Sequence, residues 1–276
     1  MTKHPPARSR LRRWLLWCCL PLLAVGGCAA PDAEGATLTA LKVGKADALI
    51  LKAGAHTVLI DAGEDEDSAE ILSFLKKQGV EALDALVVTH FDKDHVGGAD
   101  GILRGIAVSA VYDAAYESDS TEYRAYEAAL AETGVPRTRV GDQTALTFGA
   151  LTLTLIPSPV VTDQDNDRSL SLSVTDGRHS FLLPGDAEEA LIDALLGAGL
   201  AAHDILKLPH HGRWKENLPA LLDAVQPRAV FITDSQKNPA EASTLALLAE
   251  RGIRTHCTKD GDIAVRSGAS GLTVTQ

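Results

Sequence analysis

Cysteine is scarce in this 276-residue chain, and long apolar runs are absent from it. Three of the four cysteines, Cys18, Cys19 and Cys28, lie near the amino terminus, which leaves Cys257 alone in the rest of the chain. A disulfide framework is therefore excluded, and the fold must be held together by its core. The longest apolar stretch, residues 14–25, falls short of the roughly 20 residues that a membrane-spanning helix needs.

Positive charge is also in short supply. Residues 1–27 contain five of the 26 Lys and Arg and no Asp or Glu, so residues 28–276 hold 21 basic against 37 acidic residues, a formal net charge of −16. This excess of acid opposes the steering of long polyanions such as duplex DNA, whose binding relies on many Lys and Arg contacts.

The amino terminus has the pattern of a secretory signal. Basic residues precede the apolar stretch and small residues follow it. The end of the stretch, Val25-Gly26-Gly27-Cys28, resembles a bacterial lipobox. We therefore predict a signal peptide over residues 1–27, lipidation of Cys28 and a short tether over residues 28–36. The protein would be an exported bacterial lipoprotein, anchored to the cell membrane or outer membrane and facing outside the cytoplasm.

The remaining residues, 37–276, read as one α/β domain. Three short strands at 37–43, 48–52 and 57–60 precede a helix with apolar residues on one face at 68–77. Further strands are predicted over 82–88, 107–112, 151–156, 170–174, 180–183, 204–208 and 229–233, and helices near 98–104, 121–132, 187–195, 218–225 and 244–251. Hairpins and helical crossovers occur in both halves, which predicts two mixed sheets sandwiched between helices.

The densest group of chemically active side chains lies at residues 90–95. His90, Asp92, Asp94 and His95 directly follow an apolar run. Carboxylates this close together repel each other unless a cation neutralises them. Mixed nitrogen and oxygen ligands suit zinc, manganese or iron. The end of a strand is also where α/β proteins commonly place their chemistry, so the group predicts a metal site.

Three later segments occupy the same kind of position. Asp186 follows the strand at 180–183, His210 and His211 follow the strand at 204–208, and a polar loop lies at 163–169. Each has an ordinary structural explanation alone, such as a helix cap for Asp186 or a solvated loop for the histidines. Their recurrence at strand ends indicates that they meet the first group in one site.

These motifs resemble the metallo-β-lactamase fold superfamily, and more narrowly its ComEC/Rec2-like metallo-hydrolase branch in a free-standing lipoprotein form. The superfamily motif is His-x-His-x-Asp-His. The sequence His90-Phe91-Asp92-Lys93-Asp94-His95 has Asp in place of the second His, as that branch does. Five further matches are Val43-Gly44 with Asp47-Ala48, Asp61-Ala62-Gly63, Asn166 with Ser169, Pro184-Gly185-Asp186 and Pro209-His210-His211-Gly212. The resemblance implies a four-layer αββα sandwich.

The resemblance also implies a centre that holds one or two divalent ions, zinc or manganese. The predicted metal ligands are His90, Asp92, Asp94, His95, Asp186 and His210. His210 is preferred to His211 because it is closer to the strand end. Asp186 would bridge the two metal positions, and Asp94 would be the catalytic residue that orients a water. Its many carboxylates shift the preference of the site from zinc towards manganese.

The first of the two positions, at His90 and Asp92, departs from the superfamily pattern. No histidine lies between Tyr112 and His179 to complete it. Asn166 or Asp167 would be a weak substitute. The second position, built on Asp94 and His95, is therefore the safer prediction.

Several side chains are expected to contact the substrate. The predicted contacts are His211, Lys93, Asn166, Ser169, Lys207 and Arg213, with Arg168 as a further available cation. The Gly-Gln-Gly-Asp-Ala stretch of the branch is Gly-Lys-Ala-Asp-Ala at residues 44–48, and Arg213 replaces the serine that follows its His-His-Gly. Both changes are expected to alter substrate contacts.

The function implied is an extracytoplasmic, metal-dependent hydrolase of phosphodiester or related ester bonds. Its substrate would be an anionic small molecule or a nucleic acid, and its membrane contact would be the lipid anchor. A β-lactamase is disfavoured because the motif lacks the second His. The alternative is a non-catalytic or weakly active metal-binding lipoprotein that acts as a binding or accessory module, and the incomplete first position favours it.

Overall fold

The computed structural model describes residues 35–276, so the predicted signal peptide, Cys28 and nearly all of the tether lie outside the described residues. The strands are β1 Thr37–Ala40, β2 Leu49–Ala53, β3 His56–Ile60, β4 Ala82–Leu83, β5 Ala85–Val88, β6 Ala107–Val108, β7 Val111–Ala114, β8 Arg137–Val140, β9 Thr144–Phe148, β10 Leu151–Ile156, β11 Ser171–Thr175, β12 Ser180–Leu183, β13 Ile205–Lys207, β14 Ala229–Ile232, β15 Arg254–Cys257, β16 Ile263–Gly268 and β17 Gly271–Thr275. The helices are α1 Ser68–Lys77, α2 Lys93–Val96, α3 Ala99–Gly105, α4 Thr121–Thr133, α5 Glu189–Gly197, α6 Leu218–Val225 and α7 Ala242–Glu250, with short 3₁₀ turns at η1 Asp65–Asp67, η2 Asn166–Arg168, η3 Pro209–Gly212 and η4 Thr258–Asp260.

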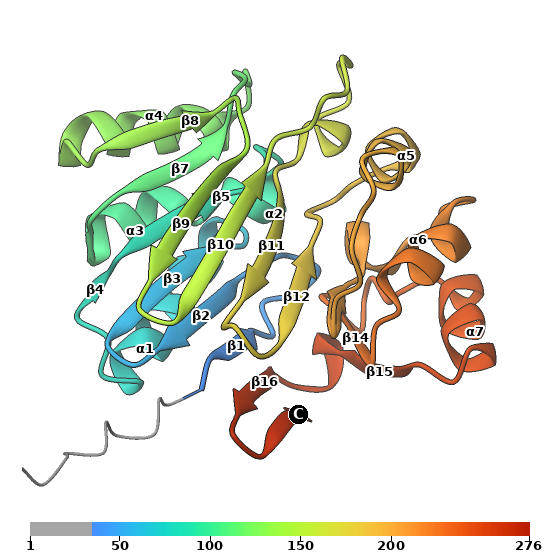
Figure 1. Cartoon of the computed structure of the whole chain (residues 1–276). Helices are drawn as coiled ribbons and strands as arrows, with labels where there is room; N and C mark the ends of the chain where they lie inside the picture. The colour runs from blue at the N-terminus through green and yellow to red at the C-terminus, as the bar shows by residue number, and fades with distance from the viewer. Residues whose placement is uncertain (1–34) are drawn as a thin grey trace, which may run out of the picture. The chain divides into compact units, whose positions relative to one another are not determined.

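Two mixed sheets carry most of the strands. One has eight strands in the order β17-β16-β1-β2-β3-β5-β7-β8, and the other has seven in the order β15-β14-β13-β12-β11-β10-β9. Strands β3, β5, β7 and β8 run parallel, as do β12 to β15. The sheets face each other, with α1, α3 and α4 outside the first and α5, α6 and α7 outside the second (Figure 1). The predicted four-layer αββα architecture is confirmed.

Alternating side chains bury both faces of the seven-stranded sheet. On β12, Phe181 and Leu183 belong to the core that includes the first sheet, whereas Leu182 packs with Leu191 of α5 and Leu222 of α6. Successive side chains of a strand point to opposite faces, and here both faces are covered. This double burial explains why the parallel strands read as uninterrupted apolar runs in the sequence.

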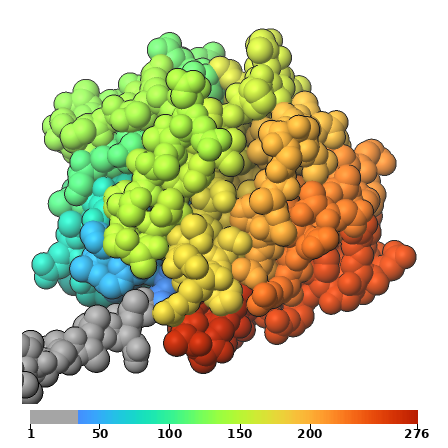
Figure 2. Space-filling view, viewed as in Figure 1, coloured from blue at the N-terminus to red at the C-terminus, as the bar shows by residue number. Residues whose placement is uncertain are grey.

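The two sheets are also joined near the carboxyl terminus. Ser267 of β16 donates a hydrogen bond to Asp176, which lies in the turn between β11 and β12. Figure 2 shows the red carboxyl-terminal strands directly beneath the yellow turn. Strand β16 in turn pairs with β1. The last strands of the chain therefore help to fix the spacing of the two sheets.

Polar side chains from the predicted motifs and from their neighbours lie just beyond the carboxyl ends of parallel strands. Asp61 follows β3, His90 follows β5, and Asp186 follows β12. His211 lies in η3 after β13, and Thr233 follows β14. Because the carboxyl ends of parallel strands share one edge of a sheet, the packing of the two sheets brings both edges to a common site.

Two local predictions need correction. The run at 82–88 forms two strands, since Asp84 interrupts it: its N–H bonds to the Thr57 carbonyl at 2.9 Å and its carboxylate accepts the Thr57 N–H at 2.7 Å. The predicted strand at 107–112 is likewise divided, because β4 pairs with β6 apart from the main sheet. Among residues 35–276, no helix has the length and apolar character needed to cross a membrane.

Candidate metal centre

The two imidazoles of the first motif lie side by side beyond β5. Helix α2 starts directly after Asp92, and its single turn brings His95 back towards His90. Their ring centroids are 4.0 Å apart and both side chains are buried. Between them, Phe91 is part of the core, and its N–H donates to the Tyr116 hydroxyl oxygen at 3.0 Å. Core packing therefore anchors the segment and holds the two imidazoles in place.

His95 is oriented by a buried carboxylate. Its Nδ1 lies 2.7 Å from Asp61 Oδ2 and donates to it, while Thr89 donates to the same carboxylate from its N–H and its hydroxyl, each at 2.7 Å. The Nε2 atom is left free, 3.3 Å from Asp186 Oδ1. Burial lowers the pKa of His95, but the charges of Asp186 and Asp61 outweigh it and hold that pKa well above its usual range.

His211 approaches from the second sheet. Its Nδ1 donates to the Thr233 carbonyl at 2.7 Å, and the Thr233 hydroxyl donates to Asp47 at 2.6 Å. Its Nε2 lies 3.1 Å from Asp186 Oδ2 and 3.5 Å from Asp94 Oδ2. Burial lowers the pKa of His211, but Asp186 outweighs it and raises that pKa.

The neighbouring imidazole, His210, faces a different set of groups. Its Nδ1 bonds to Glu188, which also bonds to Lys215, and its Nε2 is 3.9 Å from Asp186 Oδ2. His210 and His211 both adopt left-handed backbone angles, with φ of 45° and 53°. The structure thus places His211, rather than the predicted His210, beside both Asp94 and Asp186.

Asp186 and Lys207 form the buried floor of the centre. The Lys207 Nζ lies 2.6 Å from Asp47 Oδ2 and 3.2 Å from Asp186 Oδ1, and it donates to the Gly185 carbonyl at 3.0 Å. Burial raises the pKa of Asp186, but His211, His95 and Lys207 outweigh it and hold that pKa well below its usual range. Lys207 was expected to contact substrate, yet its side chain is 0% exposed. It is an internal counter-charge.

The donor set fits a divalent metal. The Nε2 atoms of His90, His95 and His211 are buried and have no hydrogen-bond partner within residues 35–276. Donor atoms of His90, His95 and Asp186 lie within 4.8 Å of one another, as do those of Asp47, His95 and His211. Three buried imidazole nitrogens without a partner among these residues, beside ionised carboxylates, fit a divalent-metal site.

One predicted ligand of the first position, Asp92, lies partly outside the buried centre. Asp92 Oδ2 lies 3.8 Å from His90 Nε2, and the Asp92 side chain is 42% exposed. His179, the next histidine along the chain after His95, lies in the turn between β11 and β12. Its Nδ1 is 3.3 Å from Asp204 Oδ2. The carboxylate of Asp167, a weak substitute in the sequence, accepts the N–H groups of Glu188 and Leu191 at the start of α5.

The other predicted substrate contacts are spread over different environments. Ser169 is fully buried, and its hydroxyl accepts the Asp186 N–H at 3.4 Å, so it supports a predicted ligand. Lys93 is exposed and pairs with Glu64 at 3.1 Å. Asn166 has a buried side-chain oxygen without a partner in the described part of the chain. Arg213 is exposed beside His211 and lines a recess there.

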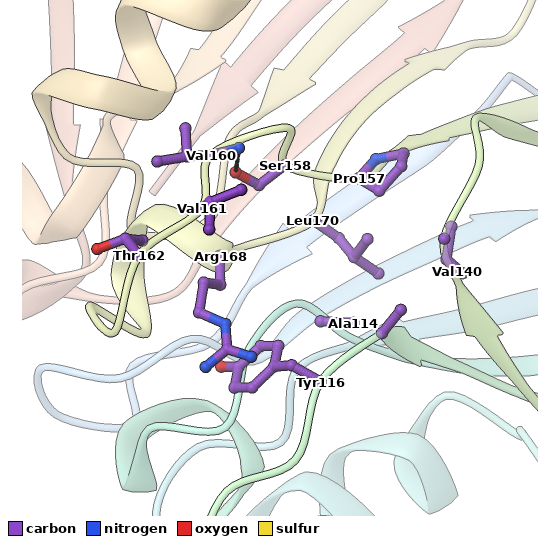
Figure 3. Close-up of a pocket in the computed structure, with 12 residues that line it drawn as sticks. Ala114, Tyr116, Val140, Pro157, Ser158, Val160, Val161, Thr162, Arg168 and Leu170 are labelled. Carbon is purple, nitrogen blue, oxygen red and sulfur yellow. Dashed lines mark hydrogen bonds between the residues drawn. The ribbon is translucent and has the colours of Figure 1, made fainter.

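A second recess, of about 350 Å³, opens beside the loop that carries the first motif. Figure 3 shows the Arg168 guanidinium lying over the Tyr116 ring, with Val160 and Val161 on the loop next to Arg168. The guanidinium carbon is 3.7 Å from the ring centroid. Because Tyr116 accepts the Phe91 N–H, this wall is tied directly to the segment between His90 and Asp92.

Five groups around the centre were not predicted as site residues. They are Lys45, Asp47, Asp61, Glu188 and Thr233. Asp61 had a usable signal, because it follows an apolar strand in the same way as the predicted residues. Asp47 and Thr233 are 186 residues apart and meet only because the two sheets pack together.

Residues 41–232 match the family model of the metallo-beta-lactamase superfamily, and the chain belongs to that superfamily. The solved structure of the metallo-beta-lactamase fold protein YhfI from Bacillus subtilis superposes with a TM-score of 0.58 over 87% of this chain and 100% of that chain. At 13% identity, this likeness shows the fold alone.

Two curated relatives place the chain more narrowly. It is 30% identical over 204 residues to Recombination protein 2 of Haemophilus influenzae, covering 72% of this chain and 24% of that protein. It is 29% identical over 205 residues to ComE operon protein 3 of Bacillus subtilis, covering 71% and 26%. These matches confirm the ComEC/Rec2-like branch that the motifs indicated. The chain spans about a quarter of the length of these relatives.

Proposed function

We propose that this protein is a metal-dependent hydrolase of phosphodiester or related ester bonds that acts outside the cytoplasm. The observation that carries the proposal is that the buried Nε2 atoms of His90, His95 and His211 have no hydrogen-bond partner within residues 35–276 and face a centre that also contains Asp94 and Asp186. Orphaned buried nitrogens are costly in a folded protein, so a site that keeps three of them is organised for a ligand.

The residues of the second position would hold the tighter ion. We assign to it Asp94, His95 and His211, with Asp186 shared between the positions, and we assign His90 and Asp92 to the first position. His211 takes the place of His210 in this assignment because its Nε2 is close to both Asp94 and Asp186. A divalent ion bound there would supply Lewis-acid polarisation of the scissile group and acidify a water.

Asp94 is the residue best placed to orient the attacking water. Burial raises its pKa, but the nearby His211, His95 and Lys45 outweigh it and hold that pKa far below its usual range. Lys45 Nζ lies 3.0 Å from Asp94 Oδ2. Asp94 therefore stays anionic at neutral pH and can accept a hydrogen bond from a water aimed at the substrate.

The supporting hydrogen bonds fix the orientation of each imidazole. Asp61 holds His95 through Nδ1, and the Thr233 carbonyl holds His211 through Nδ1. Because Nδ1 keeps its proton in both rings, Nε2 is the nitrogen that faces the centre and would give up its proton to a metal ion. Such partners keep the donor atoms in position before any ligand arrives.

The test combines metal content with activity. Native-purified protein should contain at least about one divalent ion per chain, and Mn²⁺- or Zn²⁺-loaded protein should cleave bis-p-nitrophenyl phosphate or single-stranded DNA. His95→Ala should lose both properties. If wild-type turnover is no better than that of His95→Ala with every metal tried, the protein is a binding or accessory module. Less than about one ion per chain would remove the metalloenzyme proposal itself.

The location of the protein is tested separately. The lipobox-like sequence supports lipidation of Cys28, which would tether the protein to the outer face of the cell membrane or to the outer membrane. Replacing Cys28 with Ser should move the protein from the membrane fraction to the soluble fraction. Unchanged membrane association would argue against the anchor without affecting the hydrolase proposal.

A further inference from the structure

A basic recess of about 250 Å³ adjoins the centre on the side of His211. Its walls include Lys45, Arg213 and Lys237, together with His211 itself. The volume is several times the roughly 30 Å³ that one water occupies in the liquid. The recess therefore has room for a small polyatomic group next to the predicted metal ligands.

Three cations from distant parts of the sequence converge on this recess. Lys45 precedes β2, Arg213 follows η3, and Lys237 lies between β14 and α7. Neither Arg213 nor Lys237 forms an ion pair with another residue of the range 35–276, and Glu241 is the acidic residue in the lining. On a chain with a net charge of −11, such a local excess of positive charge favours an anionic occupant.

Lys45 connects the recess to the reacting end of the centre. Its Nζ is 3.0 Å from Asp94 Oδ2, and His211 Nε2 is 3.5 Å from the same oxygen. A substrate whose scissile ester lies against Asp94 would therefore extend its next group into the recess.

We propose that this recess is a subsite for a second phosphate group, adjacent in the substrate to the bond that is hydrolysed. The inference rests on the proposed hydrolase function and narrows it: the preferred substrate carries two neighbouring phosphate groups, as a short nucleic-acid strand does. Binding involves only about two phosphates. For a single strand, the logarithm of the binding constant should therefore fall with the logarithm of the salt concentration with a slope of roughly −1.4.

The activity test uses one diester with and without a neighbouring phosphate. A thymidine dinucleotide is compared with its 5′-phosphorylated and 3′-phosphorylated forms in metal-loaded protein. We expect one phosphorylated form to have a kcat/KM roughly tenfold higher, mainly through KM, and the double variant Arg213→Gln/Lys237→Gln to lose this preference. The control Lys76→Gln/Lys77→Gln removes two exposed charges from α1 and should retain it. Equal rates for all three dinucleotides, or a preference that survives in the double variant, would overturn the subsite.

A second measurement does not depend on hydrolysis. Trp214 is adjacent to Arg213, and in the full chain with Trp14→Phe and Trp17→Phe it is the single tryptophan. Titration of the metal-free protein with pyrophosphate should change its fluorescence saturably, and Arg213→Gln/Lys237→Gln should raise the Kd roughly tenfold. An unchanged Kd would count against the subsite. If no substrate is cleaved but this titration succeeds, the hydrolase proposal fails alone.

Discussion

The two metal positions of the candidate centre, called its first and second halves below, differ in how their predicted ligands are charged. In the second half, Asp94 has a pKa held below its usual range and His95 and His211 have raised pKa values, so acid and base stabilise each other's charged forms. In the first half the directions are reversed. Burial lowers the pKa of His90 well below its usual range, and burial followed by the charge of Asp94 raises the pKa of Asp92.

The cause of this difference lies behind the ligands. The second half is supported by Asp61 on His95, by Thr233 on His211 and by Lys207 between two carboxylates. His90 has one such contact, with the Thr89 hydroxyl at 3.1 Å. Metal affinity depends on the groups that orient the ligands and stabilise their charges as well as on the ligands themselves. The two positions should therefore bind ions with unequal affinity.

The largest expected effect comes from removing the internal cation of the second half. Lys207→Met leaves Asp47 and Asp186 buried without their counter-charge, which should lower the free energy of unfolding of the metal-free protein by about 3–5 kcal/mol. Urea denaturation monitored by circular dichroism measures this. Lys76→Met, at an exposed position of α1, is the control and should change it by less than about 0.5 kcal/mol. Equal stability of the two variants would show that Lys207 does not support the centre.

The adjacent histidines provide a matched test of which imidazole belongs to the second half. His211→Ala removes a nitrogen next to Asp94 and Asp186, and should weaken the tightest metal binding by roughly 100-fold or more. His210→Ala should weaken it by less than about tenfold, because the Nδ1 of His210 is bonded to Glu188. Competition with a chelator of known affinity gives both values. The reverse ranking would return the ligand role to His210.

The pH dependence of stability should also come from the second half. The pKa values of His95 and His211 are raised in the folded, metal-free protein, so their stabilising contribution is complete below the unfolded value of about 6.5 and is lost as pH rises through the folded values. The free energy of unfolding should therefore fall as the pH rises above 6.5. The slope corresponds to a difference of up to about two bound protons between the folded and the unfolded protein. In His211→Gln the slope should be roughly halved. A flat wild-type profile would contradict the coupled imidazoles.

The smallest effect is expected in the first half. Asp92 is partly exposed and lies 3.8 Å from His90, so Asp92→Asn should leave the tighter metal affinity within about twofold of wild type and weaken only a second, looser ion. Asp94→Asn is the matched comparison in the second half, and there the tighter ion should be lost. Isothermal titration of metal-free protein with Mn²⁺ separates the two ions. Equal losses in both variants would mean that the two halves are not distinct.

The sequence was informative where chemistry is locally dense. His90, Asp92, Asp94 and His95 follow one apolar strand within six residues, and a strand end also marked Asp186. The choice between His210 and His211 depended on two consecutive left-handed backbone conformations, which side-chain type alone does not reveal.

The sequence did not reveal other parts of the centre, such as the role of Lys207, for a different reason. Lys207 ends a buried strand, and its role is evident only once Asp47 and Asp186, from opposite sheets, are seen around it. Sequence spacing carries no information about contacts that sheet packing creates between residues far apart in the chain. The fold was more accessible than the centre because apolar periodicity is repeated in every strand and helix.

The buried Lys207 also affects the order in which the protein folds and binds its ion. Small zinc domains are unfolded without their ion because nothing else offsets the repulsion and lost entropy of gathering the ligands. Here a covalently attached ammonium already balances part of the negative charge, and two extensive apolar clusters supply the stability. The polypeptide can therefore reach its native fold first and acquire its ion afterwards. The identity of that ion then depends on which metals are available when the finished protein meets them.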